Sequence, residues 1–127
     1  MTPIHKLDDH KPIYIQIKER IEDAILDGTI ESEGRIPSTN ELAKFYNINP
    51  ATARQGVNEL VQEGIVTKRR GVGMFVSEEG KKIILEKRKE QFYKKYIVPL
   101  KEEAHKLSIS EEQLVEMIVK GGEKGES

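Results

Sequence analysis

Three side chains that can form specific hydrogen bonds with DNA bases lie on one side of a predicted helix that starts at Pro50. They are Arg54, Gln55 and Asn58, and they fall opposite the apolar positions of this stretch. In the major groove, Arg can donate two hydrogen bonds to guanine, and Gln or Asn can bond in the same way to adenine. This pattern favours a helix that contacts DNA, with Arg54 as the main base-contacting residue and Gln55 and Asn58 as weaker candidates.

Two arginines at a glycine-rich turn form a second candidate group. Residues 65–68 and 74–76 are short β-type runs, and the sequence between them is RRGVG, which is typical of a hairpin. An isolated Arg pair is more often part of a solvated loop. Its position directly after a pair of helices favours a contact with the phosphate backbone, and the predicted wing contacts are Lys68, Arg69, Arg70 and Gly71.

Two short helices must position these candidates. Ser38 is followed three residues later by Glu41, a spacing typical of a capping box, in which each side chain bonds to a backbone N–H of the other residue. This spacing predicts the start of the first helix. Its inner face is expected to consist of Leu42, Ala43 and Phe45.

The second helix is predicted to follow after a sharp turn. Asn49 can cap it, and Pro50 suits its first position, where a missing N–H removes no hydrogen bond. Gly64 is expected to end it in a left-handed conformation. The apolar stripe that packs inward consists of Ala53, Val57, Leu60 and Val61. Two helices followed by a hairpin predict a mainly α fold with a small β-wing, a winged helix-turn-helix domain.

A further helix is expected to support this unit from behind. It opens at Lys11-Pro12 and ends before Gly28, and a short third strand is predicted at Arg35-Ile36, beside the wing. Glu19, Glu22 and Asp23 could suggest metal or acid chemistry, but on an amphipathic helix they are interpreted as its solvated face. The predicted buried stripe consists of Ile13, Ile17, Ile21, Ala24 and Ile25.

A composition shift at residues 77–80 marks the start of a helical tail. The tail is predicted as one long amphipathic helix that Pro99 kinks or splits near Val98. Ser110 and Gln113 form a second capping box, which starts a short final helix that is expected to end at Gly121-Gly122. The predicted bounds are 11–77 for the winged helix-turn-helix domain and 78–121 for the tail, with residues 1–10 and 122–127 disordered.

The apolar stripe of the tail has little core of its own to cover. It is therefore expected to pack against a second copy in a homodimer with two-fold symmetry, which would match a palindromic operator. Two alternatives stay open: the basic run 81–95 as a second DNA contact rather than a solvated face, and Tyr93 with Tyr96 as a ligand pocket. The predicted dimerisation residues are Leu85, Phe92, Tyr96, Leu100, Leu107, Leu114 and Ile118.

The composition excludes several classes of function. The chain lacks cysteine, and its histidines, His5, His10 and His105, are scattered, so no metal-ligand spacing or nucleophile with a base is found. We therefore expect no enzyme activity, metal or cofactor. No run is long and apolar enough for a bilayer span, and a cytoplasmic protein is expected. The net charge of the chain is −1, but residues 35–76 include six basic and only three acidic residues.

The motifs in order resemble a known family. The runs PIYIQIKERIEDAILDGTI, RIPSTNELAKFYNINPATARQGVNELVQEGIV and GVGMF resemble the DNA-binding domain of GntR-type bacterial transcription regulators over residues 12–76. The short tail and the NPAT start of the second helix resemble the YtrA subfamily. The resemblance implies double-stranded DNA as a partner, a repressor function and dimerisation through the tail. A winged helix that contacts only proteins is the alternative.

The resemblance also implies further DNA contacts. Many members of the family have Arg where this sequence has Asn40 and Pro50, whereas Arg54 and Gly71 match the family. The proposed phosphate or base-edge contacts are Ser38, Thr39, Asn40 and Thr52. Pro50 and Ala51 are predicted on the DNA-binding side of the second helix. The tail is too small for the effector domains of larger relatives. Any small-molecule effector would have to bind at the dimer interface or between tail and DNA-binding domain.

Overall fold

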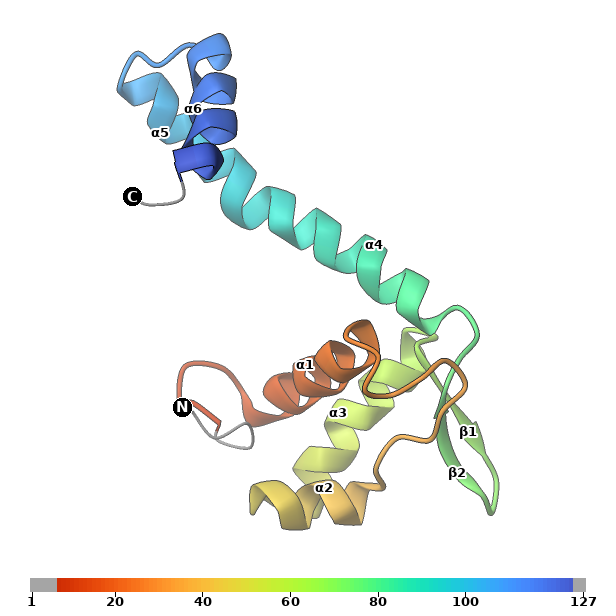
Figure 1. Ribbon diagram of the computed structural model, residues 1–127. Helices are drawn as coiled ribbons and strands as arrows, with labels where there is room; N and C mark the ends of the chain where they lie inside the picture. Colours follow the sequence, from red (N-terminus) through yellow and green to blue (C-terminus); the bar gives the residue numbers. More distant parts are fainter. Residues whose placement is uncertain (1–6, 125–127) are drawn as a thin grey trace. The chain divides into compact units, whose positions relative to one another are not determined.

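The computed structural model describes residues 7–124 and is mainly helical (Figure 1). Its described elements are α1 (Ile13–Leu26), α2 (Thr39–Tyr46), α3 (Pro50–Gln62), β1 (Val66–Arg69), β2 (Gly73–Val76), α4 (Gly80–Phe92), the π-helical segment η1 (Tyr93–Ile97), α5 (Val98–Lys106) and α6 (Glu111–Lys124). The strands β1 and β2 form one antiparallel hairpin. The predicted winged helix-turn-helix fold is confirmed. The chain divides after Lys87 into two compact units.

The core of the first unit lies where α1 and α2 pack against α3 (Figure 1). Apolar side chains from α1 and α3 are fully enclosed there, including Ile17, Val57 and Leu60. Gly56 allows the close approach of these two helices, because a Cβ at this position would lie 2.8 Å from the backbone oxygen of Tyr14. A glycine that weakens α3 as an isolated helix thus serves its packing in the folded domain.

Helix α1 begins after Pro12 and is followed by Gly28, which has a positive φ of 87°. Of its predicted stripe, Ile17, Ile21 and Ile25 are buried and Ile13 and Ala24 are half-buried. The prediction that Glu22 lies on the solvated face is wrong, because its side chain is only 2 % exposed. The reason is a partner from a distant segment, since Lys87 of α4 reaches this carboxylate.

The capping signals of α2 and α3 are confirmed. Glu41 N–H donates to Ser38 Oγ at 3.1 Å, and Ser38 N–H donates to Glu41 Oε1 at 2.8 Å. Asn49 Oδ1 accepts a hydrogen bond from Ala51 N–H at 2.8 Å, and Gly64 has the expected positive φ of 82°.

The prediction that Phe45 belongs to the inner face of α2 is wrong. Phe45 is 53 % exposed, whereas Leu42 and Ala43 are buried and Tyr46 packs at the edge of the core. At about 100° per residue, Tyr46 falls between Leu42 and Ala43 on the helical wheel, and Phe45 lies well outside that arc. The buried arc therefore runs from Leu42 through Tyr46 to Ala43 and leaves Phe45 outside.

The wing joins the segment that precedes α2. Arg35 forms a single bridge with Phe75 of β2, Ile36 N–H donates to Met74 O at 2.9 Å, and Val76 N–H donates to Gly34 O at 2.8 Å. The predicted third strand is therefore present as one bridge. It extends no further at Pro37, which has no N–H to donate to the ladder.

The start of α4 belongs to the first unit. Ile84 is fully buried in the same core as α1 and α3, and a Cβ at Gly80 would lie 2.7 Å from Ile65 O. These two contacts attach the first turns of α4 to the winged-helix unit. We therefore place the end of this unit at Lys87 instead of at residue 77.

The second unit contains the rest of the tail. The α-helical geometry changes to π-helical over Tyr93–Ile97, in the turn that precedes Pro99, as expected from a residue that lacks an N–H and crowds the preceding turn. Gln113 N–H donates to Ser110 Oγ at 3.1 Å, which confirms the second capping box. Helix α6 continues past the predicted stop at Gly121 to Lys124, because a helical glycine lowers stability without preventing the helix.

Two predicted disordered ends lie partly outside the described residues. Residues 1–6 and 125–127 are not described, so the prediction is not tested there. Residues 7–10 were predicted to be disordered, but Asp8 is held by the side chain of Gln16, whose Oε1 accepts from Asp8 N–H at 2.9 Å and whose Nε2 donates to Asp8 O at 2.7 Å. Leu7 also packs against the core.

Candidate nucleic-acid interface

The outward side of α3 carries the predicted base-contacting residues. Arg54, Gln55 and Asn58 are exposed, while Ala53 and Val57 on the opposite side are fully buried. Pro50 and Ala51 are exposed at the start of the helix, and Thr52 is half-buried beside them. The buried stripe fixes the rotation of α3, and therefore the direction in which its polar side faces solvent.

A hollow of about 250 Å³ collects residues from three parts of the first unit. Arg54 and Asn58 of α3 meet Lys68 of the wing and the start of α2 around it. Five residues of the predicted interface thus line one surface. The lining residues are Arg35, Ile36, Ser38, Thr39, Arg54, Asn58, Lys68, Gly73 and Met74.

The four predicted wing contacts do not lie together. Lys68 pairs with Met74 and lines the hollow beside α3. Its neighbour Arg69 pairs with Gly73, and its guanidinium lies 4.1 Å from the centre of the Phe75 ring. Because consecutive residues of a strand point to opposite faces, Arg69 faces away from the hollow.

The tip of the wing consists of Arg70, Gly71 and Val72. Gly71 has a positive φ of 76°, and Val72 N–H donates to Arg69 O at 2.9 Å, which closes the turn. Arg70 is exposed at this tip. Because Gly71 has no side chain, the backbone at this tip can approach a phosphate closely.

Arg35 lines the hollow but was not among the predicted contacts. Its bridge with Phe75 places it beside the wing. The predicted strand at residues 35–36 was the signal that could have found it, because a strand that pairs with the wing brings its side chains to the wing.

Acidic residues on the inner side of the domain are paired with lysines. Lys18 donates to Glu59 at 3.2 Å and also bonds to Glu63, and Lys87 donates to Glu63 at 2.7 Å. Burial acts to raise the pKa of Glu63, but its hydrogen bonds with the two lysines outweigh burial and lower the pKa. Burial acts to lower the pKa of Lys18, but its hydrogen bonds with Glu63 and Glu59 outweigh burial and raise the pKa. These pairs connect α1 and α4 to the C-terminal end of α3.

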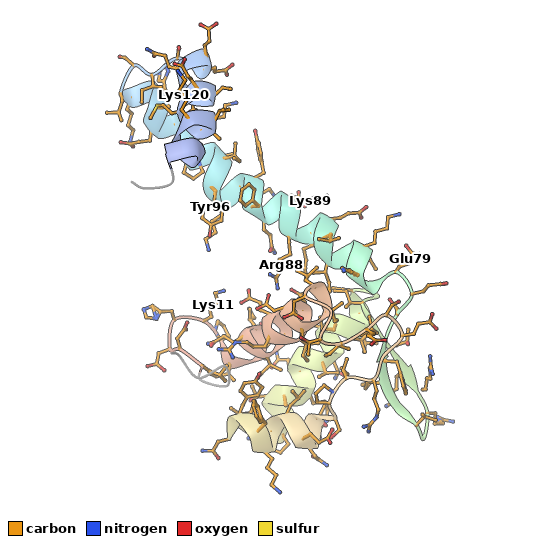
Figure 2. All side chains as sticks on the ribbon, viewed as in Figure 1. Lys11, Glu79, Arg88, Lys89, Tyr96 and Lys120 are labelled. Atoms are coloured by element: carbon orange, nitrogen blue, oxygen red, sulfur yellow. The ribbon has the colours of Figure 1, made fainter. Side chains whose placement is uncertain are left out.

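The same geometry decides the role of one cation in the basic run of the tail. The run 81–95 was interpreted as a solvated face or as a second DNA contact. Lys87 fits neither interpretation, because its ammonium group is bonded to the carboxylates of Glu22 and Glu63. Lys89, by contrast, is exposed (Figure 2).

The predicted dimerisation residues are largely exposed in the single chain. Phe92 is 56 % exposed, Leu107 is 62 % exposed and Ile118 is 60 % exposed. Tyr96 projects from the π-helical segment (Figure 2), and its ring centre lies 5.3 Å from that of Phe92. Leu85 and Leu100 are also exposed, and Leu114 is half-buried. Exposed apolar side chains of this number are unusual for a solvated surface.

The described part of the chain contains neither a metal-binding cluster nor a membrane-spanning helix. Within residues 7–124, no group of acidic, His or Cys side chains is arranged to hold a metal ion. None of the described helices is long and apolar enough to cross a membrane.

Comparison with known proteins places the chain among transcription regulators. The sequence profile of bacterial regulatory proteins of the gntR family matches residues 13–76. The chain is 34 % identical over 121 residues to the HTH-type transcriptional repressor YtrA of Bacillus subtilis, with 91 % of this chain and 92 % of that repressor covered. Several other relatives are longer, and the chain spans between 17 and 29 % of their length.

Solved structures share the fold. A GntR family transcriptional regulator from Listeria monocytogenes superimposes with a TM-score of 0.74 at 30 % identity, over 90 % of this chain and 98 % of that one. The DNA-binding domain of AraR, solved in complex with the operator ORX1, superimposes with a TM-score of 0.54 at 31 % identity, over 57 % of this chain and 94 % of that one.

Proposed function

Because the chain belongs to the GntR family of bacterial regulatory proteins, a family of transcription regulators and not of enzymes, we propose that it represses transcription by binding a specific double-stranded DNA operator. Helix α3 enters the major groove, Arg54 contacts a base there, and the wing contacts the flanking backbone. The observation that carries this proposal is the hollow at which Arg54 and Asn58 of α3 meet Lys68 of the wing and the start of α2.

The exposed side of α3 suits sequence recognition. Arg54 offers a planar guanidinium that can bond to both acceptors of guanine. It stands on a helix whose rotation is fixed by a fully buried stripe, so the backbone that carries it is already in place when the base contact forms. The AraR DNA-binding domain, which has the same fold, was solved in complex with an operator, and this supports DNA binding by the present domain.

We further propose that the regulator is a homodimer that binds a palindromic operator. The tail presents Phe92, Leu107 and Ile118 to solvent with more than half of each side chain exposed. Burial of such side chains contributes about 25 cal/mol per Å² of apolar area. A closed two-fold dimer places two copies of α3 on two half-sites, and an operator with the same symmetry follows from this arrangement.

The DNA contact is tested by selection from a pool of random duplexes at two salt concentrations, with the wild type and Arg54→Ala in parallel. The wild type is expected to enrich one sequence. The Arg54→Ala variant is expected to enrich the same sequence without the preference at one base pair. Failure of the wild type to enrich any sequence at either salt concentration would refute sequence-specific binding.

The dimer is tested separately by sedimentation equilibrium over a range of protein concentrations. Leu107→Glu combined with Ile118→Glu places two charges on the exposed stripe and should convert the dimer to monomer. Lys106→Gln, next to Leu107 and exposed in the single chain, is the matched control and should leave the dimer intact. A monomeric wild type at all concentrations would contradict the proposal.

A further inference from the structure

We propose that Arg35, together with Lys68, binds a DNA phosphate at the hollow between α3 and the wing. This inference rests on the proposed function and adds a contact to that same site. Arg35 stands outside the helix-turn-helix and outside the hairpin, in the segment that precedes α2.

The backbone at Arg35 is held firmly in place. Gly34 N–H donates to Glu31 O at 2.8 Å, and Gly34 O accepts from Val76 N–H at 2.8 Å. On the other side of Arg35, Ile36 N–H donates to Met74 O at 2.9 Å, and the Ile36 side chain is buried in the core. An arginine on such a fixed backbone loses less conformational entropy on binding than one on a loose loop.

The side chain of Arg35 passes over Gly73 of the wing. A Cβ built on Gly73 would lie 2.9 Å from Arg35 Nε and 3.7 Å from Arg35 Cδ and Cζ. The guanidinium therefore lies close to the wing backbone, and a Cβ at position 73 would force the Arg35 side chain to shift. This contact brings it to the hollow that Lys68 and Arg54 also line.

The lining of the hollow suits an anion. It contains three cations, Arg35, Arg54 and Lys68, and among the described residues that line it none is acidic. The Glu41 carboxylate, which attracts Arg35, accepts the backbone N–H of Ser38 and so remains part of the cap of α2. Ser38 and Thr39 add the positive end of α2 to the same wall. A guanidinium fork and an ammonium group together match the oxygens of a phosphate.

The phosphate is assigned to the DNA backbone beside the base that Arg54 contacts. Arg54 and Arg35 line one hollow of about 250 Å³, so a duplex seated on α3 brings its backbone to Arg35. A contact with a phosphate carries no sequence information. Arg35 should therefore add affinity for every duplex equally.

The test measures binding of the full chain to its selected operator and to an unrelated duplex over a series of salt concentrations. Arg35→Gln should weaken binding to both duplexes about tenfold and reduce the slope of log affinity against log salt by about 0.9. Arg35→Lys should keep the wild-type slope. Lys106→Gln removes one exposed charge of the tail and should leave slope and affinity unchanged.

A second variant tests the position of the side chain at constant charge. Gly73→Ala introduces the Cβ that meets Arg35 Nε, so it should weaken binding to both duplexes in the same way as Arg35→Gln. Combined with Arg35→Gln it should weaken binding no further. Gly73 has a positive φ of 142°, at which alanine is strained. Thermal unfolding of each variant therefore checks that the domain is folded.

Three outcomes separate the possibilities. Equal loss on both duplexes with the smaller slope supports the phosphate contact. If the wild type binds its operator and Arg35→Gln keeps the same affinity and slope, or changes the preferred sequence, this inference is wrong and the proposed function stands. If the wild type binds neither duplex, the proposed function itself fails.

Discussion

The ammonium group of Lys87 is hydrogen-bonded to the carboxylate of Glu22, which is only 2 % exposed. Lys87 belongs to α4 and Glu22 to α1, and 65 positions of sequence separate them. The same ammonium donates to Glu63 at 2.7 Å. This contact attaches the start of the tail helix to the back of the DNA-binding unit, together with the buried Ile84.

Removal of the Lys87 charge should destabilise the first unit. Lys87→Met keeps most of the side-chain stem but takes a charged hydrogen-bond donor from the buried Glu22, and we expect a loss of about 1–3 kcal/mol in the free energy of unfolding. Urea denaturation measures it. Lys89→Met on the same helix is the control and should change stability by less than about 0.5 kcal/mol.

A double variant separates the ion pair from the packing of the stem. Glu22→Leu combined with Lys87→Met removes both charges, so it should cost less than Lys87→Met alone. An equal or larger loss in the double variant would show that the pair is not the source of the effect.

The stability of the protein should fall in acid through Glu63. Its folded pKa is lowered by Lys18 and Lys87 below the ordinary value of 4.5, so its contribution is present above the unfolded pKa and is lost as pH falls through the folded pKa. Glu63→Gln should therefore lose less stability than the wild type between about pH 5 and pH 3 in urea titrations. Glu116→Gln, an exposed acid of α6, should follow the wild type.

At alkaline pH, the lysine of this cluster should lose its contribution to the stability of the fold. The pKa of Lys18 is raised above its ordinary value of 10.5 by Glu63 and Glu59. The stability that it contributes is fully present below that value and is lost as pH rises through the folded pKa. Lys18→Met should thus be less stable than the wild type at neutral pH, and the difference should narrow above about pH 10.5. A constant difference up to pH 12 would exclude Lys18 as the titrating group.

Gly56→Ala should destabilise the domain even though alanine is the better helix former. Alanine would contribute about 1 kcal/mol to the helix, but its Cβ would lie 2.8 Å from Tyr14 O, and such overpacking costs about 1–3 kcal/mol. The melting temperature should fall. Gly121→Ala, where a Cβ meets no atom within 4 Å, should leave it unchanged or raise it.

The two arginines Arg54 and Arg70 should affect DNA binding in different ways. Arg54→Ala should cost about 1–3 kcal/mol on the operator and relax the preference at one base pair, whereas Arg70→Ala at the wing tip should weaken all duplexes alike and lower the salt slope. Fluorescence anisotropy with operator and unrelated duplexes measures both. Equal losses on the two duplexes for Arg54→Ala would show that Arg54 does not contact a base.

Patterns of short range were predictable from the sequence. The capping boxes at Ser38 and Ser110, the cap at Asn49 and the stripe of α3 depend on neighbours within one or two turns. Such spacing is visible in a list of residues, and with the hairpin it was enough to identify the winged helix-turn-helix fold and its family.

Contacts between distant segments were decided only by the tertiary structure. Glu22 was interpreted as solvated because its partner is supplied by α4, and Phe45 was placed inside because the core selects a face of α2 centred on Tyr46. Arg35 reaches the hollow only through its pairing with β2. The sequence by itself determined which helices and turns form, since those depend on local hydrogen bonds, whereas the fold decided which charged groups meet, since that depends on how the elements pack.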